Sequence, residues 1–178
     1  MIIAISGKAG SGKSTVAREI AKKLGLRHYS IGDLMRQLAK EKKISLLELS
    51  RIAENDKSID KELDDKQIAL RKKDDFVIDG RLTAFFIPNA DLKIFLDCKD
   101  KVRAERILKD TRKDEKARTI KEVIKKIKFR EQSERKRYKE YYNVYYYNKR
   151  LYDLVIDTTN MNASQVVDRM INLIKNIK

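Results

Sequence analysis

The stretch GKAGSGKS, residues 7–14, decides the fold class, because it fits the spacing G-x-x-x-x-G-K-[ST] in full. An apolar run, IIAIS (2–6), precedes it, and Val16, Ile20 and Leu24 share one face of the helical pattern that follows. The three glycines let the backbone curl so that successive N–H groups point at one anion, and the helix adds its positive N-terminal end. The pattern predicts a strand, a phosphate-binding loop and a helix, and therefore a nucleoside triphosphate site.

Two side chains of this loop have roles that follow from their chemistry. Lys13 is expected to reach the β- and γ-phosphates, and Ser14 offers a hydroxyl oxygen to Mg²⁺. A GTPase switch is disfavoured, because the nearest match to N-K-x-D is NKRL (148–151), which lacks the aspartate. In addition, neither Gly32 nor Gly80 follows an aspartate at the spacing D-x-x-G.

The composition fits one folded domain of 178 residues, with 42% hydrophobic residues, 39% charged residues and a formal net charge of +15. Two explanations of this high charge are surface ion-pair networks that adapt a protein to heat and binding of an anionic partner. With Cys98 as the single cysteine, we expect no disulfide and a cytoplasmic setting. No apolar run approaches the roughly 20 residues that span a bilayer, so no membrane is expected as a partner. The single histidine, His28, is expected to fill space.

Short apolar runs alternate with amphipathic helical patterns along the chain. Runs this apolar are typical of strands covered on both faces, so we predict an α/β fold, with a parallel sheet of about five strands and helices on either side. Two segments between strands, 32–75 and 99–152, are long enough to hold helical insertions. The predicted strands are IIAIS (2–6), HYSI (28–31), FVID (76–79), LKIFLDC (92–98) and DLVIDT (153–158).

Charged residues follow two of these strands, in YSIGDLMR (29–36) and VIDGRL (77–82). Open α/β sheets bind ligands at such strand ends. In the second stretch, Asp79 is placed to hold an Mg²⁺-bound water beside the phosphate loop. Arg36 and Arg81 are predicted to form a clamp for a second phosphate group. In the first stretch, Asp33 is expected to cap a helix.

A helix is predicted from Thr119, which forms a capping-box pattern with Glu122, to about residue 147. Its inward stripe is apolar at first and then turns polar, with Arg130 and Arg137 two turns apart on one face. Charges on such a stripe cost free energy unless an anion meets them, and a phosphoryl group in transfer is such an anion. Ion pairs within the helix would explain the same arginines, and spacing alone does not exclude them.

The end of this helical pattern, RKRYKEYYNVYYYNKR (135–150), places six tyrosines among basic residues. That composition suits a platform on which single-stranded nucleic acid stacks. With the helical phase set from Thr119, however, Tyr138, Tyr141 and Tyr145 continue the core-facing stripe, so we expect them to pack in the interior. Nucleic acid is therefore disfavoured as a partner.

The loop GKAGSGKST, followed by YSIGDLMR and IDGR, resembles the nucleoside monophosphate kinases. In detail the chain resembles the archaeal-type cytidylate kinases. Their pattern also includes a stretch like NADLKIFLDCKDKVRAERI (89–107), an R-x-x-S-E-x-x-R-Y helix (130–138) and a closing YDLVIDT (152–158). These stretches occur in order over nearly the whole chain, so the resemblance is specific.

The resemblance implies a three-layer P-loop kinase fold in a single domain, 1–178, with an insertion at 31–75 that binds the nucleoside monophosphate and a lid at about 108–137. It implies transfer of the γ-phosphoryl group of ATP to CMP or dCMP, with Mg²⁺ as cofactor. A kinase for AMP or UMP stays open, because clamp arginines contact only phosphate, and an RNA-binding P-loop ATPase is a more distant alternative. We expect a monomer.

Carried over residue by residue, the resemblance gives a catalytic group, a metal-binding group and the residues that bind each of the two nucleotides. Lys13, Arg130, Arg137 and Asp79 would be catalytic, and Ser14 and Asp79 would hold the metal. The monophosphate would be held by Ser30, Asp33, Arg36 and Arg81. ATP would be bound by Gly7, Lys8, Ala9, Gly10, Ser11, Gly12, Lys13, Ser14 and Thr15, with Arg106 over its base.

Overall fold

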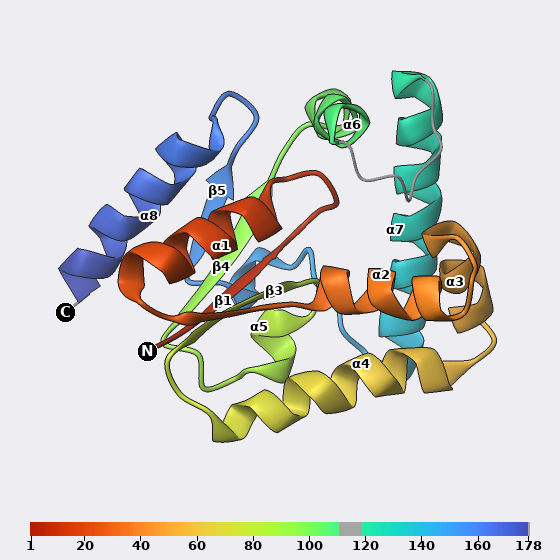
Figure 1. Ribbon diagram of the computed structural model, residues 1–178, viewed down its shortest axis with the longest axis horizontal. Helices are drawn as coiled ribbons and strands as arrows, with labels where there is room; N and C mark the ends of the chain where they lie inside the picture. The colour runs from red at the N-terminus through yellow and green to blue at the C-terminus, as the bar shows by residue number, and fades with distance from the viewer. Residues whose placement is uncertain (111–118, 178) are drawn as a thin grey trace.

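The computed structural model describes residues 1–110 and 119–177, and its centre is one parallel sheet (Figure 1). The strand order is β2-β3-β1-β4-β5, and every neighbouring pair is parallel. The predicted parallel sheet of about five strands is confirmed, and each predicted strand agrees to within one residue at either end. The strands are β1 (Ile2–Gly7), β2 (Arg27–Ser30), β3 (Phe76–Gly80), β4 (Leu92–Asp97) and β5 (Leu154–Asp157).

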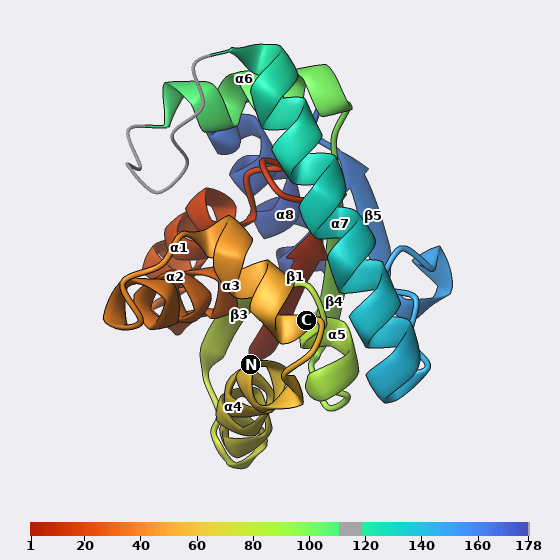
Figure 2. The same ribbon diagram turned by 90° about the vertical axis from the view of Figure 1, so that its right-hand side faces the viewer.

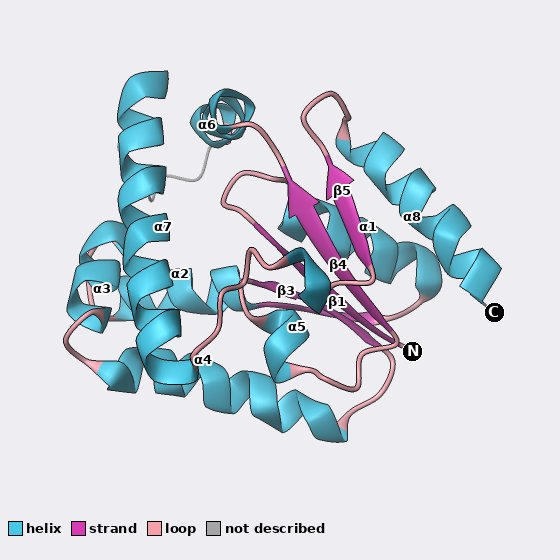
Figure 3. Ribbon diagram, turned by 180° about the vertical axis from the view of Figure 1, so that it is seen from behind, coloured by secondary structure: helices cyan, strands magenta, loops and turns pink. Residues whose placement is uncertain are grey.

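Helices cover both faces of this sheet, as Figure 3 shows. Side chains alternate along a strand, so β1 sends Ile3 and Ile5 to one face and Ile2 and Ala4 to the other. On the first face they pack against α1 (Lys13–Leu24) and α8 (Ala163–Ile177). The opposite face is covered by α5 (Thr83–Phe86), the short 3-10 helix Leu70–Lys72 and a cluster of aromatic side chains. The result is a three-layer α/β fold.

The segment between β2 and β3 forms a helical insertion with its own small core. It contains α2 (Ile31–Glu41), α3 (Leu46–Ala53) and α4 (Lys57–Ala69). Their inward residues form one apolar cluster, whose buried members are Leu38, Ala39, Leu46, Leu49, Ala53 and Ile59.

The second insertion contains α6 (Asp100–Lys109) and the long helix α7 (Ile120–Tyr142). Figure 2 shows α7 running from beside α6, past the first insertion, toward α5. Ser133 of α7 donates a hydrogen bond to the Ser50 carbonyl of α3 at 3.3 Å, which ties the two insertions together. Residues 111–118 of the expected lid lie outside the described residues.

The prediction for the end of α7 was wrong by about one turn. Asn143 takes the left-handed conformation (φ 54°), and its N–H closes the helix on the carbonyl oxygens of its last turn. The chain therefore leaves helical phase before the last tyrosines. Tyr138 packs in the aromatic cluster as expected, whereas Tyr145 is 52% exposed and Tyr146 is buried in its place.

In the part of the chain that the structure describes, each helix is too short or too polar to cross a bilayer.

Candidate active site

The phosphate loop joins β1 to α1, and close packing explains two of its glycines. A Cβ on Gly7 would lie 2.3 Å from the Leu96 carbonyl oxygen of β4, and one on Gly10 would lie 2.7 Å from the Arg103 carbonyl oxygen of α6. Gly10 also has a left-handed backbone, with φ +75°. Any side chain at these positions would push the loop away from the elements that support it.

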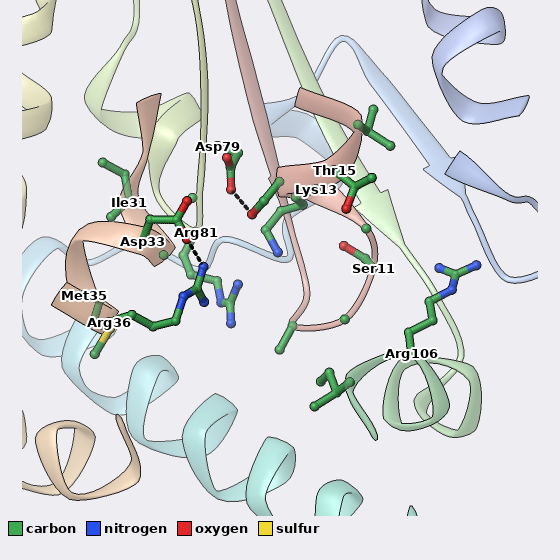
Figure 4. A pocket seen from close by; sticks show the side chains of 18 of the residues that line it. Ser11, Lys13, Thr15, Ile31, Asp33, Met35, Arg36, Asp79, Arg81 and Arg106 are labelled. Carbon is green, nitrogen blue, oxygen red and sulfur yellow. Dashed lines mark hydrogen bonds and ion pairs between the residues drawn. The ribbon is translucent and has the colours of Figure 1, made fainter. Parts of the chain in front are cut away.

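Lys13 lies in the first turn of α1 and is only 7% exposed. Its Nζ donates a hydrogen bond to the Lys8 carbonyl oxygen at 2.7 Å, so the side chain folds back across the loop, as Figure 4 shows. Burial, with the positive charge of Arg81 nearby, holds the pKa of Lys13 well below its usual value. An anionic ligand in the loop would reverse this cost, because it would stabilise the ammonium ion.

Three side chains surround Asp79 at the end of β3. Ser14 donates to Asp79 Oδ2 at 2.7 Å, and the hydroxyl of Ser30 reaches the same oxygen at 3.3 Å. His28 Nε2 lies 2.8 Å from Asp79 Oδ1. Asp79 therefore lies beside the phosphate loop, as its position after the strand predicted. His28 does more than fill space, since it orients the carboxylate.

The two clamp arginines lie on the same side of the phosphate loop, and Arg106 lies on the other (Figure 4). Arg36 pairs with Asp33 one turn earlier in α2. Arg81 donates through Nε to Glu134 at 2.9 Å and through Nη1 to the Gly7 carbonyl oxygen at 3.2 Å. Both guanidinium groups line the same cleft as the loop.

The helix cap of α2 differs from the prediction. Ser30 is the N-cap, and its hydroxyl accepts a hydrogen bond from the Asp33 backbone N–H at 3.3 Å. Asp33 lies inside the first turn, where its carboxylate meets Arg36 instead. The cap lies three residues earlier than expected, because the Ser30 hydroxyl accepts the hydrogen bond from the Asp33 N–H.

The two arginines of α7 are placed differently. Arg130 lines the cleft together with Glu134 and Tyr138. Arg137 is 1% exposed, and its Nη1 lies 2.5 Å from both carboxylate oxygens of Asp60 on α4. In this structure Arg137 is paired with Asp60 and is not among the residues that line the cleft, and its contact with the transferred group stays a prediction. The inward stripe of α7 meets α4 at this level, and a buried carboxylate there neutralises the arginine.

Arg106 of α6 is held on the loop that follows β5. Its Nη2 donates to the carbonyl oxygens of Thr158, at 2.7 Å, and Met161, at 2.9 Å, and Nη1 donates to the Thr158 hydroxyl at 3.1 Å. The Thr158 hydroxyl in turn donates to the Ser11 carbonyl oxygen of the phosphate loop at 3.1 Å. Arg106 thus lines the cleft where the residues after β5 contact the phosphate loop.

Sequence reasoning missed several residues of the site because their partners lie far away along the chain. Arg103 supports the loop by donating to the Ala9 carbonyl oxygen at 3.1 Å, and it pairs with Glu131 at 2.5 Å. Its position on α6 gave no signal apart from a charge in a helical pattern. Three polar residues of α4 also line the cleft and were not predicted: Asp60, Asp64 and Gln67.

Most of these groups line one cleft of about 810 Å³ between the sheet, α2, α4, α6 and α7. This volume falls in the range of about 300–1,000 Å³ that is typical of small-molecule sites. The described part of the chain brings together most of the predicted residues at its wall. Those lining it are Ala9, Gly10, Ser11, Gly12, Lys13, Ser14, Thr15, Asp33, Arg36, Asp79, Arg81, Arg106 and Arg130.

Solved structures similar to this chain share its fold. A shikimate kinase from Bacteroides thetaiotaomicron superposes with a TM-score of 0.67 at 14% identity, over 98% of each chain. A deoxyadenosine kinase from M.mycoides, described with dCMP and dCDP as bound products, superposes with a TM-score of 0.59 at 18% identity, over the whole of each chain.

Sequence relatives give the family. The cytidylate kinase of Methanosphaera stadtmanae is 40% identical over the full length of both chains. That of Methanocaldococcus jannaschii is 40% identical over 100% of this chain and 99% of its own, and that of Pyrococcus horikoshii is 40% identical over 93% and 84%. The model of the cytidylate kinase-like family matches residues 2–160. With nearly its whole length matched, the chain belongs to the cytidylate kinase-like family.

Proposed function

We propose that this protein transfers the γ-phosphoryl group of ATP to CMP or dCMP, giving ADP and CDP or dCDP. The observation that carries the proposal is one cleft that holds Lys13 of the phosphate loop together with Arg36 and Arg81. A loop of this kind binds the phosphates of the donor, and a pair of arginines binds the phosphate of the acceptor. The names of the relatives supply the choice of CMP.

Positioning and electrostatic stabilisation supply the catalysis in this proposal. Lys13 contacts the β- and γ-phosphates, and Arg130, on the cleft wall, contacts the group in transfer. The acceptor is already an anionic phosphate, so no general base is required. Arg137 joins α7 to α4 in the observed arrangement, because it forms an ion pair with Asp60. Arg106 flanks the base of ATP, from its place beside Thr158.

The residues around Asp79 fit Mg²⁺. Ser14 Oγ and Asp79 Oδ2 lie 2.7 Å apart at the start of α1, and hydroxyl and carboxylate oxygens are ligands that this ion prefers. Asp79 would hold it through water and Ser14 directly. Held by Ser14 and Asp79, Mg²⁺ would supply positive charge that neutralises the charge developing on the phosphate oxygens.

The two insertions have different roles within a single domain, 1–178. The 31–75 insertion carries Arg36 and binds the monophosphate, and the 108–137 region carries Arg130 and acts as the lid. We infer a monomer, since the described residues proposed to hold both phosphates belong to one chain. Free Cys98 and nucleotide substrates fit a cytoplasmic setting.

A coupled assay of ADP formation with CMP, dCMP, UMP and AMP tests the proposal. CMP or dCMP should give the highest kcat/KM, and Lys13→Met should lower kcat/KM for CMP by at least about 100-fold without unfolding the protein. Faster turnover of AMP or UMP than of CMP would assign the kinase to another monophosphate. Tight, salt-dependent RNA binding without CMP turnover would favour the RNA-binding alternative.

A further inference from the structure

The helix α4 turns an unusually polar face toward the cleft. Asp60, Leu63, Asp64 and Gln67 fall at helical spacing on one side, each is less than 9% exposed, and all four line the cleft. A buried amphipathic helix ordinarily presents apolar residues at such positions. Polar groups there cost free energy unless hydrogen-bond partners meet them, so each of the three calls for a partner.

Only Asp60 is fully matched by the protein itself. Both of its oxygens accept from Arg137 Nη1 at 2.5 Å, which makes a buried ion pair between α4 and α7. This pair fixes the polar face of α4 in place. It leaves Asp64 and Gln67, one and two turns further along, as the groups still to be explained.

Asp64 is half matched. Its Oδ2 accepts a hydrogen bond from the Tyr142 hydroxyl, while Oδ1 has no donor among residues 1–110 and 119–177. Burial raises the pKa of Asp64 to about 6, with the Tyr142 hydrogen bond opposing the rise. At neutral pH the carboxylate is therefore ionised in the main, and Oδ1 is an anionic acceptor at the cleft.

Gln67 provides the second, independent sign of a missing ligand. It is 3% exposed, and within the described residues its Oε1 has no hydrogen-bond partner. Its Nε2 makes one long contact, 3.5 Å, with the Leu63 carbonyl oxygen of the same helix. The unpaired atom is an acceptor, so the ligand that matches it must carry a donor.

We infer that Asp64 and Gln67 read the base of the acceptor nucleotide and select cytosine over uracil. This inference rests on the proposed function. The N4 amine of cytosine carries two N–H groups, of which one donates to Asp64 Oδ1 and the other to Gln67 Oε1. Arg36 holds the phosphate of the same nucleotide from α2, which packs against α4. Ile31, Met35 and Tyr138 also line this cleft and supply apolar surface for the ring.

Uracil reverses the pattern, because it carries an acceptor, O4, where cytosine carries the N4 amine, and a donor at N3. Its O4 would face the Asp64 carboxylate and Gln67 Oε1 with no proton between them. A site built to hydrogen-bond one group rejects an analogue that leaves its buried polar groups unpaired, by up to about 10⁴–10⁵-fold. The carboxylate is thus the element that disfavours UMP.

The test measures kcat/KM for CMP and UMP with wild type, Asp64→Asn and Gln67→Leu. Asp64→Asn keeps the shape but offers a donor to O4, so kcat/KM for CMP should fall at least about 10-fold and the UMP/CMP ratio should rise at least about 100-fold. Gln67→Leu should lower kcat/KM for CMP with little change in the KM for ATP. Asp65→Asn, at an exposed position on the same helix, is the matched control and should leave all values unchanged.

A substrate analogue tests the inference with the wild-type protein, so that the result does not depend on whether the variants fold. The pyrimidin-2-one ribonucleoside monophosphate lacks the 4-amine, so wild type should use it at least about 10-fold less well than CMP, and Asp64→Asn should discriminate less between the two. Equal use of both substrates by wild type, or a CMP preference in Asp64→Asn as strong as in wild type, would overturn the inference. Absence of CMP turnover by wild type would instead overturn the proposed function.

Discussion

The Nε atom of Arg81 and the Oε2 atom of Glu134 lie 2.9 Å apart, and this largely buried ion pair joins the end of β3 to the middle of α7. Burial alone would lower the pKa of Arg81, but the carboxylate of Glu134 raises it well above its usual value. In the same way, Arg81 and Arg130 lower the pKa of Glu134 although burial alone would raise it. Because Arg81 also donates to Gly7, the pair connects the phosphate loop to α7.

Replacing Glu134 by Gln should destabilise the fold, because it leaves the largely buried Arg81 charge without its counter-ion. Breaking one partner of a buried pair typically costs about 3–5 kcal/mol. Urea denaturation of wild type and Glu134→Gln checks the value. Glu140→Gln, at an exposed position on the same helix, should change the free energy of unfolding by less than about 0.5 kcal/mol.

The same variant has a defined pH dependence. The folded-state pKa of Glu134 is depressed, so the stability that its charge contributes is present above the unfolded value, near pH 4.5, and is lost as pH falls through the folded value. The gap in unfolding free energy between wild type and Glu134→Gln should therefore shrink on acidification below about pH 4.5. A gap that stays constant from pH 7 to pH 3 would show that the charge contributes nothing.

Gly7 and Gly12 allow a test of what the loop glycines do. Both have positive φ, but a Cβ on Gly7 would lie 2.3 Å from the Leu96 carbonyl oxygen, whereas nothing lies within 4 Å of a Cβ on Gly12. Gly12→Ala should cost only the backbone strain, about 1–2 kcal/mol. Gly7→Ala should cost more, because β1 and β4 must separate. Thermal denaturation of the two variants compares them directly, and equal losses would contradict the packing argument.

Much of the fold follows from local sequence, because its signals are short in range. The phosphate loop, the five strands and the Thr119 cap each depend on residues within a few positions of one another. Asp79 and Arg81 were predictable for the same reason, since a parallel sheet brings the ends of its strands to one edge. The end of α7 was not predicted, because its C-cap is Asn143 and asparagine also occurs within helices, so the spacing of the tyrosines favoured a longer helix.

The parts of the site that local sequence did not reveal are pairs far apart along the chain. Arg137 meets Asp60 77 positions away, and Tyr142 meets Asp64 78 positions away. The helical period correctly placed Arg137 on an inward stripe, but it could not say that a carboxylate, rather than a phosphoryl group, lies opposite. Which face of α4 meets α7 is set by tertiary packing, and no local pattern encodes it.

The Asp60–Arg137 pair can be tested by a double-mutant cycle with Asp60→Asn and Arg137→Met. If each single change leaves the other charge buried, both singles should destabilise the protein, and the double variant should be more stable than their sum by about 1–3 kcal/mol. Urea denaturation measures the coupling. Additive effects on stability, together with a loss of about 10³-fold or more in kcat for Arg137→Met, would instead assign Arg137 to the transferred phosphoryl group.

Arg36 should act on the acceptor alone. In the structure it pairs with Asp33 on the cleft wall, so its release to a substrate phosphate costs little of the fold. Arg36→Ala should therefore raise the KM for CMP about 10–100-fold, equivalent to about 1.4–2.8 kcal/mol, while the KM for ATP and the melting temperature change little. Lys40→Ala removes an exposed charge from the same helix and serves as the control for net charge. Steady-state kinetics with each substrate varied in turn separates the two constants, and an equal rise in the KM for ATP would mean that Arg36 does not distinguish the acceptor phosphate from the donor.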